Sequence, residues 1–226
     1  MLLGKQATTR RHAPMVGAAL SAIHKLITTV PEPIRTACSD MLAEVSFDPG
    51  GQVPGDVDAK HYPQLQEFID DRRVCRLEYK SPVEAEVMRC QFHPYALHFA
   101  SRAWYVLGWT DLHEQTRTFK LARIISLSPT NSTFKGPARF TAGRHLGKAW
   151  QLIPEGSVHR VELEFTSKVG LNVSEVQWHR SQRHELLPDG RCLMTFEVDG
   201  LEEIAWWICG YGDQVQVRSP GALRQR

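Results

Sequence analysis

Apolar residues recur at helical spacing between residues 15 and 45, and Pro31 and Pro33 interrupt the pattern midway. This spacing predicts two helices joined as a helical hairpin. Residues 48–55 are rich in Pro and Gly, which cannot extend a helix, and they predict a linker. The periodic apolar positions are Val16, Ala19, Leu20, Ile23, Leu26 and Ile27, then Ile34, Ala37, Cys38, Met41 and Leu42.

The middle of the chain changes from helical to strand periodicity. Residues 62–71 have the spacing of a short helix, with Leu65, Phe68 and Ile69 predicted to point inward. Stretches rich in β-branched and aromatic residues follow, separated by turn signals such as Ser81-Pro82. They predict strands at residues 74–80, 86–99, 102–110, 116–121 and 124–129. Five short strands this close together usually curl into a small β-barrel.

The last third has a different order of elements. A strand at residues 158–165 precedes a helix that begins at Ser167, and two strands flank the turn Pro188-Asp189-Gly190. A helix at residues 201–209 and a strand at residues 214–218 complete the order βαββαβ. This order predicts a ferredoxin-like domain with both helices on one face of the sheet. The fold class expected for the whole chain is therefore α+β.

Composition predicts a globular protein with unpaired cysteines. Its 226 residues, 42% of them hydrophobic, are enough to bury a core, and the length suits two compact domains. The five cysteines form no CxxC pair and no metal-like cluster, which predicts free thiols in the cytoplasm. Neither a membrane span nor a signal peptide is expected, because no apolar run approaches the ~20 residues that a span requires.

Positive charge is concentrated in the middle of the chain. Residues 1–70 carry 6 basic and 8 acidic side chains, residues 71–148 carry 13 and 6, and residues 149–226 carry 8 and 11. The balances of −2, +7 and −3 make the predicted strand region the expected place for contact with phosphates. The alternative is that basic residues simply occupy solvated strand faces.

Alternation along the strand at residues 102–110 divides its side chains between two faces. The two sets are Trp104, Val106 and Gly108, and Tyr105, Leu107 and Trp109. The second set is bulkier and is predicted to be core. That assignment leaves Trp104 partly exposed beside Gly108, where the missing side chain would admit a flat ligand. In the alternative, Trp104 packs at the end of the barrel.

Arg117 and Arg123 flank an apolar pair on the next predicted strand, and Lys120 lies between them. Because guanidinium can grip a phosphate bidentately and stack on a ring, the two arginines are better candidate anchors than the lysine. A ligand role is favoured for Arg117, whereas a salt bridge within the domain is favoured for Arg123.

His93 and Tyr95 are two residues apart and share a strand face if the chain stays extended through Pro94. An imidazole can bind a base edge and a phenol ring can stack, and Arg89 lies four residues upstream on the same predicted face. Since proline fits only an edge strand or a bulge, the pair can also mark a bend in the barrel.

Catalytic signatures are missing from the sequence. There is no HExxH, no GxSxG, no GxGxxG and no P-loop among its residues. The expectation is therefore a binding protein that is not an enzyme, with no cofactor and no metal.

Two stretches carry a family resemblance. The tripeptide Trp104-Tyr105-Val106, with residues 89–95 and 117–124, resembles the WYL domain over residues 60–131. The closing third resembles the C-terminal extension domain that follows WYL in many regulators, on landmarks that include Gln177-Trp178-His179 and residues 207–212. The resemblance marks as ligand residues His93, Tyr95, Trp104, Tyr105, Arg117, Lys120 and Arg123.

The resemblance implies an Sm-like barrel, similar to an SH3 fold, that senses nucleotides or single-stranded nucleic acid in bacterial transcriptional regulators. The expected parts are a helical linker or dimerisation segment at residues 1–48, the WYL barrel at residues 60–135 and the ferredoxin-like extension at residues 150–226. Three positions depart from the family pattern: Val106 for leucine, Lys120 where arginine is common and Ala122 where aspartate is common.

A winged helix-turn-helix usually precedes WYL in such regulators and binds operator DNA, and no such pattern is evident before residue 15. The expected function is therefore the effector-binding part of a homodimeric regulator, with operator DNA contacted through a domain that this chain lacks. The alternative is a nucleic-acid-binding accessory protein that acts without its own operator-binding domain.

Overall fold

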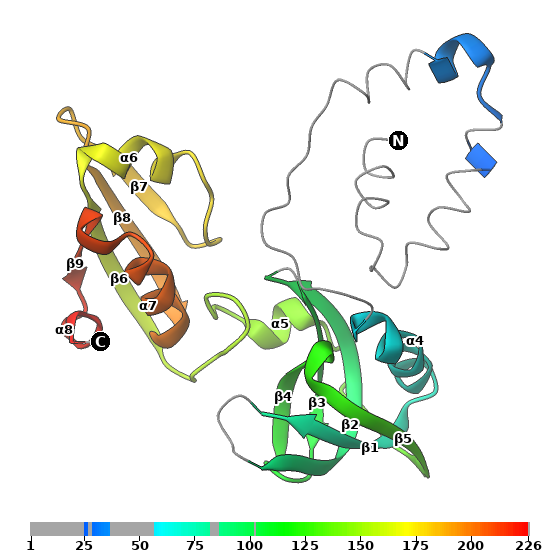
Figure 1. Ribbon diagram of the computed structural model, residues 1–226. Helices are drawn as coiled ribbons and strands as arrows, with labels where there is room; N and C mark the ends of the chain where they lie inside the picture. The colour runs from blue at the N-terminus through cyan, green and yellow to red at the C-terminus, as the bar shows by residue number, and fades with distance from the viewer. Residues whose placement is uncertain (1–24, 27–28, 37–56, 82–85, 102, 226) are drawn as a thin grey trace. The chain divides into compact units, whose positions relative to one another are not determined.

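The computed structural model describes residues 25–26, 29–36, 57–81, 86–101 and 103–225 (Figure 1). The chain folds as two compact units, residues 1–139 (unit 1) and 140–226 (unit 2). Most of the helical hairpin expected at residues 15–45 lies outside the described residues, although residues 32–36 are helical.

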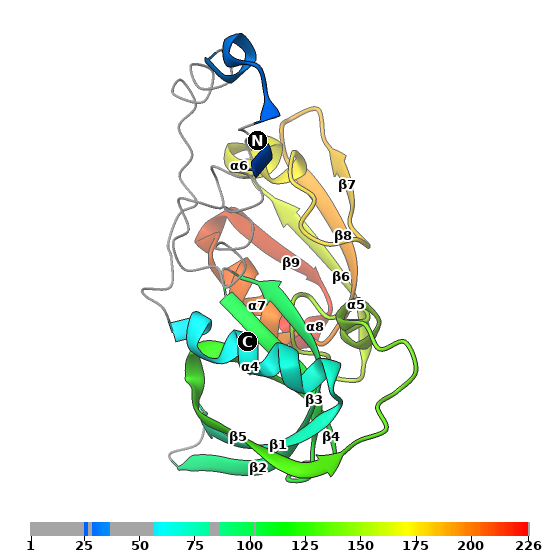
Figure 2. The same ribbon diagram turned by 90° about the vertical axis from the view of Figure 1, so that its right-hand side faces the viewer.

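In unit 1, helix α4 packs against a five-stranded antiparallel sheet. The strand order is β4-β3-β2-β1-β5, and Figure 2 shows the sheet curling beneath α4. The elements are α4 Val57–Asp70, β1 Arg73–Lys80, β2 Val87–Ala100, β3 Ala103–Thr110, β4 Gln115–Lys120, the short 3₁₀ helix η1 Leu121–Arg123 and β5 Ile124–Thr133.

The sheet is open, which corrects the expectation of a closed barrel. Strands β4 and β5 stand at its two edges, and no ladder of hydrogen bonds joins them within the described part of the chain. They are connected instead through η1, whose three residues turn the chain from one edge to the other.

One face of this sheet, the inner face, buries its side chains against α4. The helix contributes Tyr62, Leu65 and Phe68, which recur at a spacing of three residues and so lie on one side. Ring contacts tie the sheet together, with Phe119 edge-to-face against Phe92 at 5.2 Å between centroids. The sheet contributes Cys75, Leu77, Tyr79, Met88, Cys90, Phe92, Val106 and Phe119.

The inner core takes the face of β3 opposite to the one predicted. Val106 is fully buried in it and lies opposite Phe119, whereas Tyr105 and Trp109 are only half-buried. Of the predicted core set, only Leu107 is fully buried, and it lies outside the inner core cluster. Alternation correctly separates the two sets of residues, but bulk does not decide which set is core. The deciding feature is the pairing of Val106 with Phe119 of the neighbouring strand, because both side chains are buried in the inner core.

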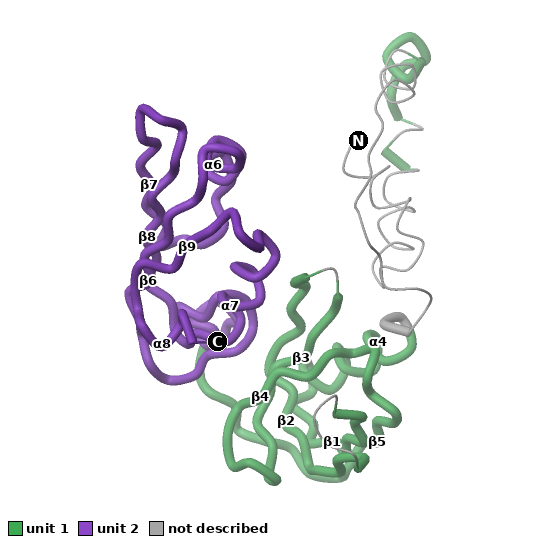
Figure 3. The backbone as a smooth tube through the Cα atoms, turned by 60° about the vertical axis from the view of Figure 1, so that its left-hand side comes forward, with its two compact units in different colours: residues 1–139 green, residues 140–226 purple. Residues whose placement is uncertain are grey.

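Unit 2 has the predicted element order βαββαβ (Figure 3). Its sheet is antiparallel with the order β7-β8-β6-β9, so the first and third strands of the unit pair at the centre. The elements are α5 Ala142–Leu146, β6 Val158–Phe165, α6 Ser167–Ser174, β7 Arg183–Leu186, β8 Cys192–Asp199, α7 Glu202–Cys209, η2 Gly212–Gln214, β9 Val215–Ser219 and α8 Gly221–Arg224.

Both long helices of unit 2 cover the same face of its sheet. Val173 of α6 and Ile204 and Ile208 of α7 belong to one buried cluster with the inward side chains of β6 and β8. The alternate residues of these strands form the opposite face, here called the polar face, which carries Arg160, Glu162, Glu164, Thr195 and Glu197.

Within the described residues, no helix combines the length and the apolar character that crossing a membrane requires.

The reversed faces of β3 lead to a stability prediction. Phe119→Ala is expected to lower the free energy of unfolding of unit 1 by about 3–5 kcal/mol, because it removes a buried ring from the inner core. Tyr105→Ala is expected to cost less, because this side chain is half-buried. Urea unfolding followed by circular dichroism compares the two variants, and a larger loss for Tyr105→Ala would contradict the assignment.

His61 leads to a prediction about pH. The side chain is 4% exposed, and burial, reinforced by Lys60, lowers the pKa of His61 below the usual 6.5. The unfolded chain therefore takes up a proton that the folded chain resists, and stability should fall as the pH drops through about 6.5. In thermal melts, His61→Asn should show a smaller acid-induced fall in Tm than the unchanged protein. An equal fall would rule out His61 as a cause.

Candidate functional site

The sheet face of unit 1 that points away from α4, here called the outer face, is set by strand register. Residues directly opposite on paired antiparallel strands share a face. His93 lies opposite Trp109, while Tyr105 lies opposite both His98 and Lys120. These side chains therefore belong to the face opposite Val106 and Phe119.

A bulge in β2 brings His93 and Tyr95 to the same side. Pro94 pairs with Gly108 and Ala96 with Leu107, so Tyr95 is the extra residue of the bulge. The His93 ring stacks on Phe134, with centroids 5.1 Å apart and planes inclined by 6°, and the Tyr95 ring lies 5.5 Å from the same ring. The irregularity expected at the proline is confirmed, and both rings reach Phe134 because of the bulge and not because the strand stays extended.

Four rings form what we call the outer aromatic cluster: His93, Tyr95, Trp109 and Phe134. His93 is central, since its ring centroid is also 4.9 Å from that of Trp109. The chain stays close after β5, because a Cβ on Gly136 would lie 3.1 Å from the Phe134 ring and 3.5 Å from Tyr95. All four side chains are only half-buried. Part of each ring therefore remains accessible for stacking by a flat ligand.

Burial sets the ionisation of the cluster. It lowers the pKa of His93, with Asp111 opposing the change, and it raises the pKa of Tyr95. At neutral pH the imidazole is therefore uncharged and offers one donor and one acceptor, and the phenol keeps its proton. This chemistry suits the edge of a nucleobase.

A hollow of about 410 Å³ lies on the outer face of β1, β2 and β5 and is bounded by Asp111. The hollow and the outer aromatic cluster share one face of β2, on which Gln91 of the lining lies two residues before His93. Arg76 is exposed and has no ion-pair partner within the described residues, so it is the available cation of this hollow. The other lining residues are Leu77, Glu78, Arg89, Cys90, Ser126 and Ser128.

Arg89, which was predicted as a ligand residue, is engaged by its own sheet. Its Nε donates to Oε1 of Glu78 at 2.7 Å, and Ser126 donates to the other carboxylate oxygen at 2.9 Å. The guanidinium lowers the pKa of Glu78, followed by the Ser126 hydroxyl. The arginine side chain is 73% exposed, so the pair contributes little to stability and can be rearranged by a ligand.

Trp104 lies away from this cluster. Its ring makes edge contacts with Tyr62 at 4.8 Å and Phe99 at 5.3 Å, and it packs against the inner core. The space expected beside Gly108 is already filled, because a Cβ there would lie 2.2 Å from the His93 carbonyl oxygen and 2.6 Å from the Phe92 ring. The packing interpretation of Trp104 is therefore the one that the geometry favours.

The remaining predicted residues are dispersed. Arg117 is exposed on edge strand β4, opposite Gly108. Lys120 and Tyr105 lie opposite one another on the outer face. Arg123 ends η1 and lines a separate hollow of about 260 Å³ with Lys80 and Ser81. The salt bridge favoured for Arg123 is not found among the residues that the structure describes.

Sequence reasoning missed Trp109, Phe134 and Arg76. Trp109 was assigned to the core, and strand alternation alone could not correct this. Phe134 follows the last strand of unit 1, where an aromatic residue in a polar stretch was the only signal. Arg76 alternates with the buried Cys75 and Leu77 and reads as an ordinary solvated position.

A metal site is not formed within the described part of the chain, where no group of three His, Cys, Asp or Glu side chains is placed to hold an ion. Cys75, Cys90 and Cys192 are buried free thiols, and Cys209 is an exposed one. Burial raises the pKa of Cys75 to about 12, so this thiol is inert at neutral pH.

Comparisons with known families match both units. Residues 60–129 match the family model of the WYL domain, and residues 157–226 match that of the WCX domain. No curated protein matches the chain.

Solved structures similar to this chain include proteasome accessory factor B/C (PafBC) of Arthrobacter aurescens, with 23% identity and a TM-score of 0.36 over 83% of this chain. A second is described as a CRISPR Cas-related protein, with 11% identity and a TM-score of 0.47 over 74% of this chain. This chain spans 28% of the first protein and 49% of the second.

Proposed function

Because the chain is a member of the WYL-domain proteins, with a WYL domain followed by a WCX domain, we propose that it is the ligand-sensing module of a bacterial transcriptional regulator. The role is one of binding rather than catalysis, and the proposed location is the cytoplasm. In such a regulator, contact with operator DNA belongs to a further domain.

The proposed ligand is a nucleotide or a single-stranded nucleic acid bound on the outer face of unit 1. The observation that carries this proposal is the position of the half-buried outer aromatic cluster beside the hollow that contains Arg76. Rings stack on bases while an arginine fork holds a phosphate, and stacking contributes ~1–3 kcal/mol per base. The excess of basic residues in residues 71–148 supports the same ligand class.

Two finer fold assignments accompany this function. We take the curled five-stranded sheet of unit 1 as an open form of the Sm-like barrel. The ferredoxin-like assignment of unit 2 is supported by its βαββαβ order and by the central pairing of β6 with β8.

Binding on the outer face is expected to depend on Phe134. Phe134→Ala should weaken binding of a fluorescently labelled short single-stranded DNA by ~1–3 kcal/mol, because it removes the ring on which His93 and Tyr95 rest. Phe99→Ala is the matched control, since Phe99 is a 41% exposed ring of the same unit that packs on Trp104. Fluorescence anisotropy at low salt measures both variants.

Loss of binding in Phe99→Ala but not in Phe134→Ala would move the site to the Trp104 region. Absence of binding for single-stranded DNA, single-stranded RNA and a panel of nucleotides would remove the proposal.

Arg76→Gln should in addition lower the slope of the logarithm of affinity against the logarithm of salt concentration by about 0.7, the value of one phosphate contact on a single strand.

We also propose a homodimer, because regulators that read two half-sites need two-fold symmetry. In unit 2, α7 leaves Trp206 61% exposed on the side away from its core. Light scattering is expected to give twice the chain mass of 25.6 kDa, and Trp206→Glu should shift the protein toward the monomer. A monomer at micromolar concentration would contradict the dimer and favour the accessory-protein alternative.

A further inference from the structure

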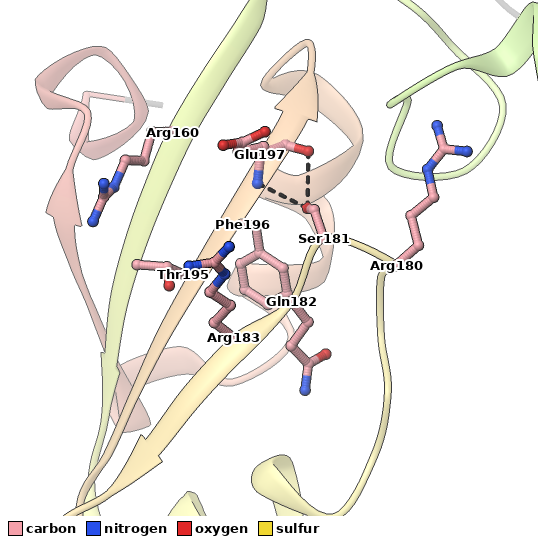
Figure 4. Close-up of a pocket in the computed structure, with 8 residues that line it drawn as sticks. All are labelled: Arg160, Arg180, Ser181, Gln182, Arg183, Thr195, Phe196 and Glu197. Carbon is pink, nitrogen blue, oxygen red and sulfur yellow. Dashed lines mark hydrogen bonds between the residues drawn. The ribbon is translucent and has the colours of Figure 1, made fainter.

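The polar face of unit 2 holds a second group of arginines that the proposed function does not use. Strand register places Arg183 of β7 opposite Thr195 of β8, and Arg160 of β6 opposite Glu197 of β8. Arg180 precedes β7 in the connecting loop. Figure 4 shows the Arg183 guanidinium beside Thr195, while Arg160 and Arg180 extend outward on opposite sides of it.

These arginines line one hollow of about 290 Å³. Its remaining lining comes from Ser181, Gln182, Thr195, Phe196 and Glu197. The lining therefore carries three positive side chains and one negative one, although residues 149–226 as a whole are acidic. The hollow is therefore locally positive although residues 149–226 carry a net negative charge.

Elsewhere on this face, arginines form ion pairs with carboxylates. In the hollow, only one of the three arginines does so among the residues that the structure describes. At the far end of the sheet, Glu164 accepts from Arg191 at 2.5 Å and from Nε of Arg218 at 2.8 Å. In the hollow, Arg160 donates to Glu162 at 2.9 Å. Arg180 and Arg183 have no carboxylate partner within the described residues.

The one carboxylate in the lining, that of Glu197, forms an ion pair with a residue outside the hollow. Glu197 accepts from Lys148 Nζ at 2.5 Å. Lys148 lowers the pKa of Glu197, and Arg183 and Arg160 contribute further at longer range. Because Lys148 balances this charge, the excess of the arginines remains available to an anion.

The backbone that presents Arg180 and Arg183 is held firmly. The Ser181 hydroxyl accepts from the Glu197 amide at 2.8 Å and donates to the Glu197 carbonyl at 2.9 Å, as Figure 4 shows. Gln182 accepts from the Trp178 amide at 2.8 Å and donates to the Val176 carbonyl at 2.9 Å. These bonds fix the two residues between the arginines, so a ligand would order only the side chains.

We propose that this hollow is a phosphate-binding site on unit 2, separate from the outer face of unit 1. Guanidinium forks bind phosphate oxygens bidentately, so Arg183 with the neighbouring Thr195 hydroxyl can hold a phosphoryl group, while Arg160 and Arg180 add positive charge at the two sides of the hollow. The phosphate comes from a free nucleotide or pyrophosphate, or from the backbone of a single strand.

The test uses the full chain with the double variant Arg180→Gln/Arg183→Gln. The matched control is Lys168→Gln/Arg224→Gln, which removes two positive charges from exposed positions of the same unit outside the hollow. Pyrophosphate binding is measured by calorimetry and binding of a labelled short single-stranded DNA by anisotropy, both at low salt. The double variant is expected to weaken binding by about tenfold or more, and the control to change it little.

The two probes separate the sources of phosphate. Loss of pyrophosphate binding in the double variant supports a site for free phosphate compounds, and loss confined to DNA supports a site for the strand backbone. Equal losses in the double variant and the control, equally tight binding of a hexaglutamate peptide, or no binding of either probe would overturn the proposal.

Phe134→Ala should leave pyrophosphate binding unchanged. DNA binding that is sensitive to Phe134→Ala alone, together with pyrophosphate binding that the double variant leaves unchanged, would reject this site and leave the function proposed for unit 1 intact.

Discussion

The close approach of β2 and β3 at Gly108 is the constraint on which unit 1 depends. A Cβ at this position would collide with the His93 carbonyl and with the Phe92 ring, so only glycine lets Phe92 lie over β3 and reach Phe119. Immediately afterwards the bulge at Pro94 shifts the register by one residue. Phe92 is thereby buried in the core, while His93 and the extra Tyr95 both reach Phe134 on the outer face.

The two faces of the sheet consequently use aromatic residues for different purposes. Inner rings such as Phe92 and Phe119 are almost fully buried and stabilise the fold. The outer rings are half-buried, contact one another, and share the outer face of the sheet with exposed Arg76. Rings in this setting contribute less to the core but leave stacking surface beside a cation, which is the combination that single-stranded nucleic acids and nucleotides require. Unit 2 repeats the division, with aromatic packing under its helices and arginines on its polar face.

Local patterns predicted most of the elements, because strand alternation and turn residues are properties of neighbours in sequence. They gave the strands of both units to within a few residues, the bend at Pro94 and the shared face of His93 and Tyr95. They could not assign the faces of β3, because that depends on Phe119 from another strand. Local patterns also could not predict whether the five strands form a closed barrel or an open sheet. In unit 1, Phe134 joins its cluster only through tertiary contacts, and in unit 2 strand pairing alone places Arg160 on the same hollow as Arg180 and Arg183, so no spacing in the sequence predicts either group.

We infer that the ligand binds on the outer face of unit 1. The most direct measurement is an NMR titration of the tryptophan indole resonances of the full chain with a short single-stranded DNA. Trp109 contacts His93 in the outer aromatic cluster, whereas Trp104 packs against the inner core. We expect the Trp109 resonance to shift progressively while that of Trp104 stays in place. A shift of Trp104 with Trp109 unchanged would contradict this inference.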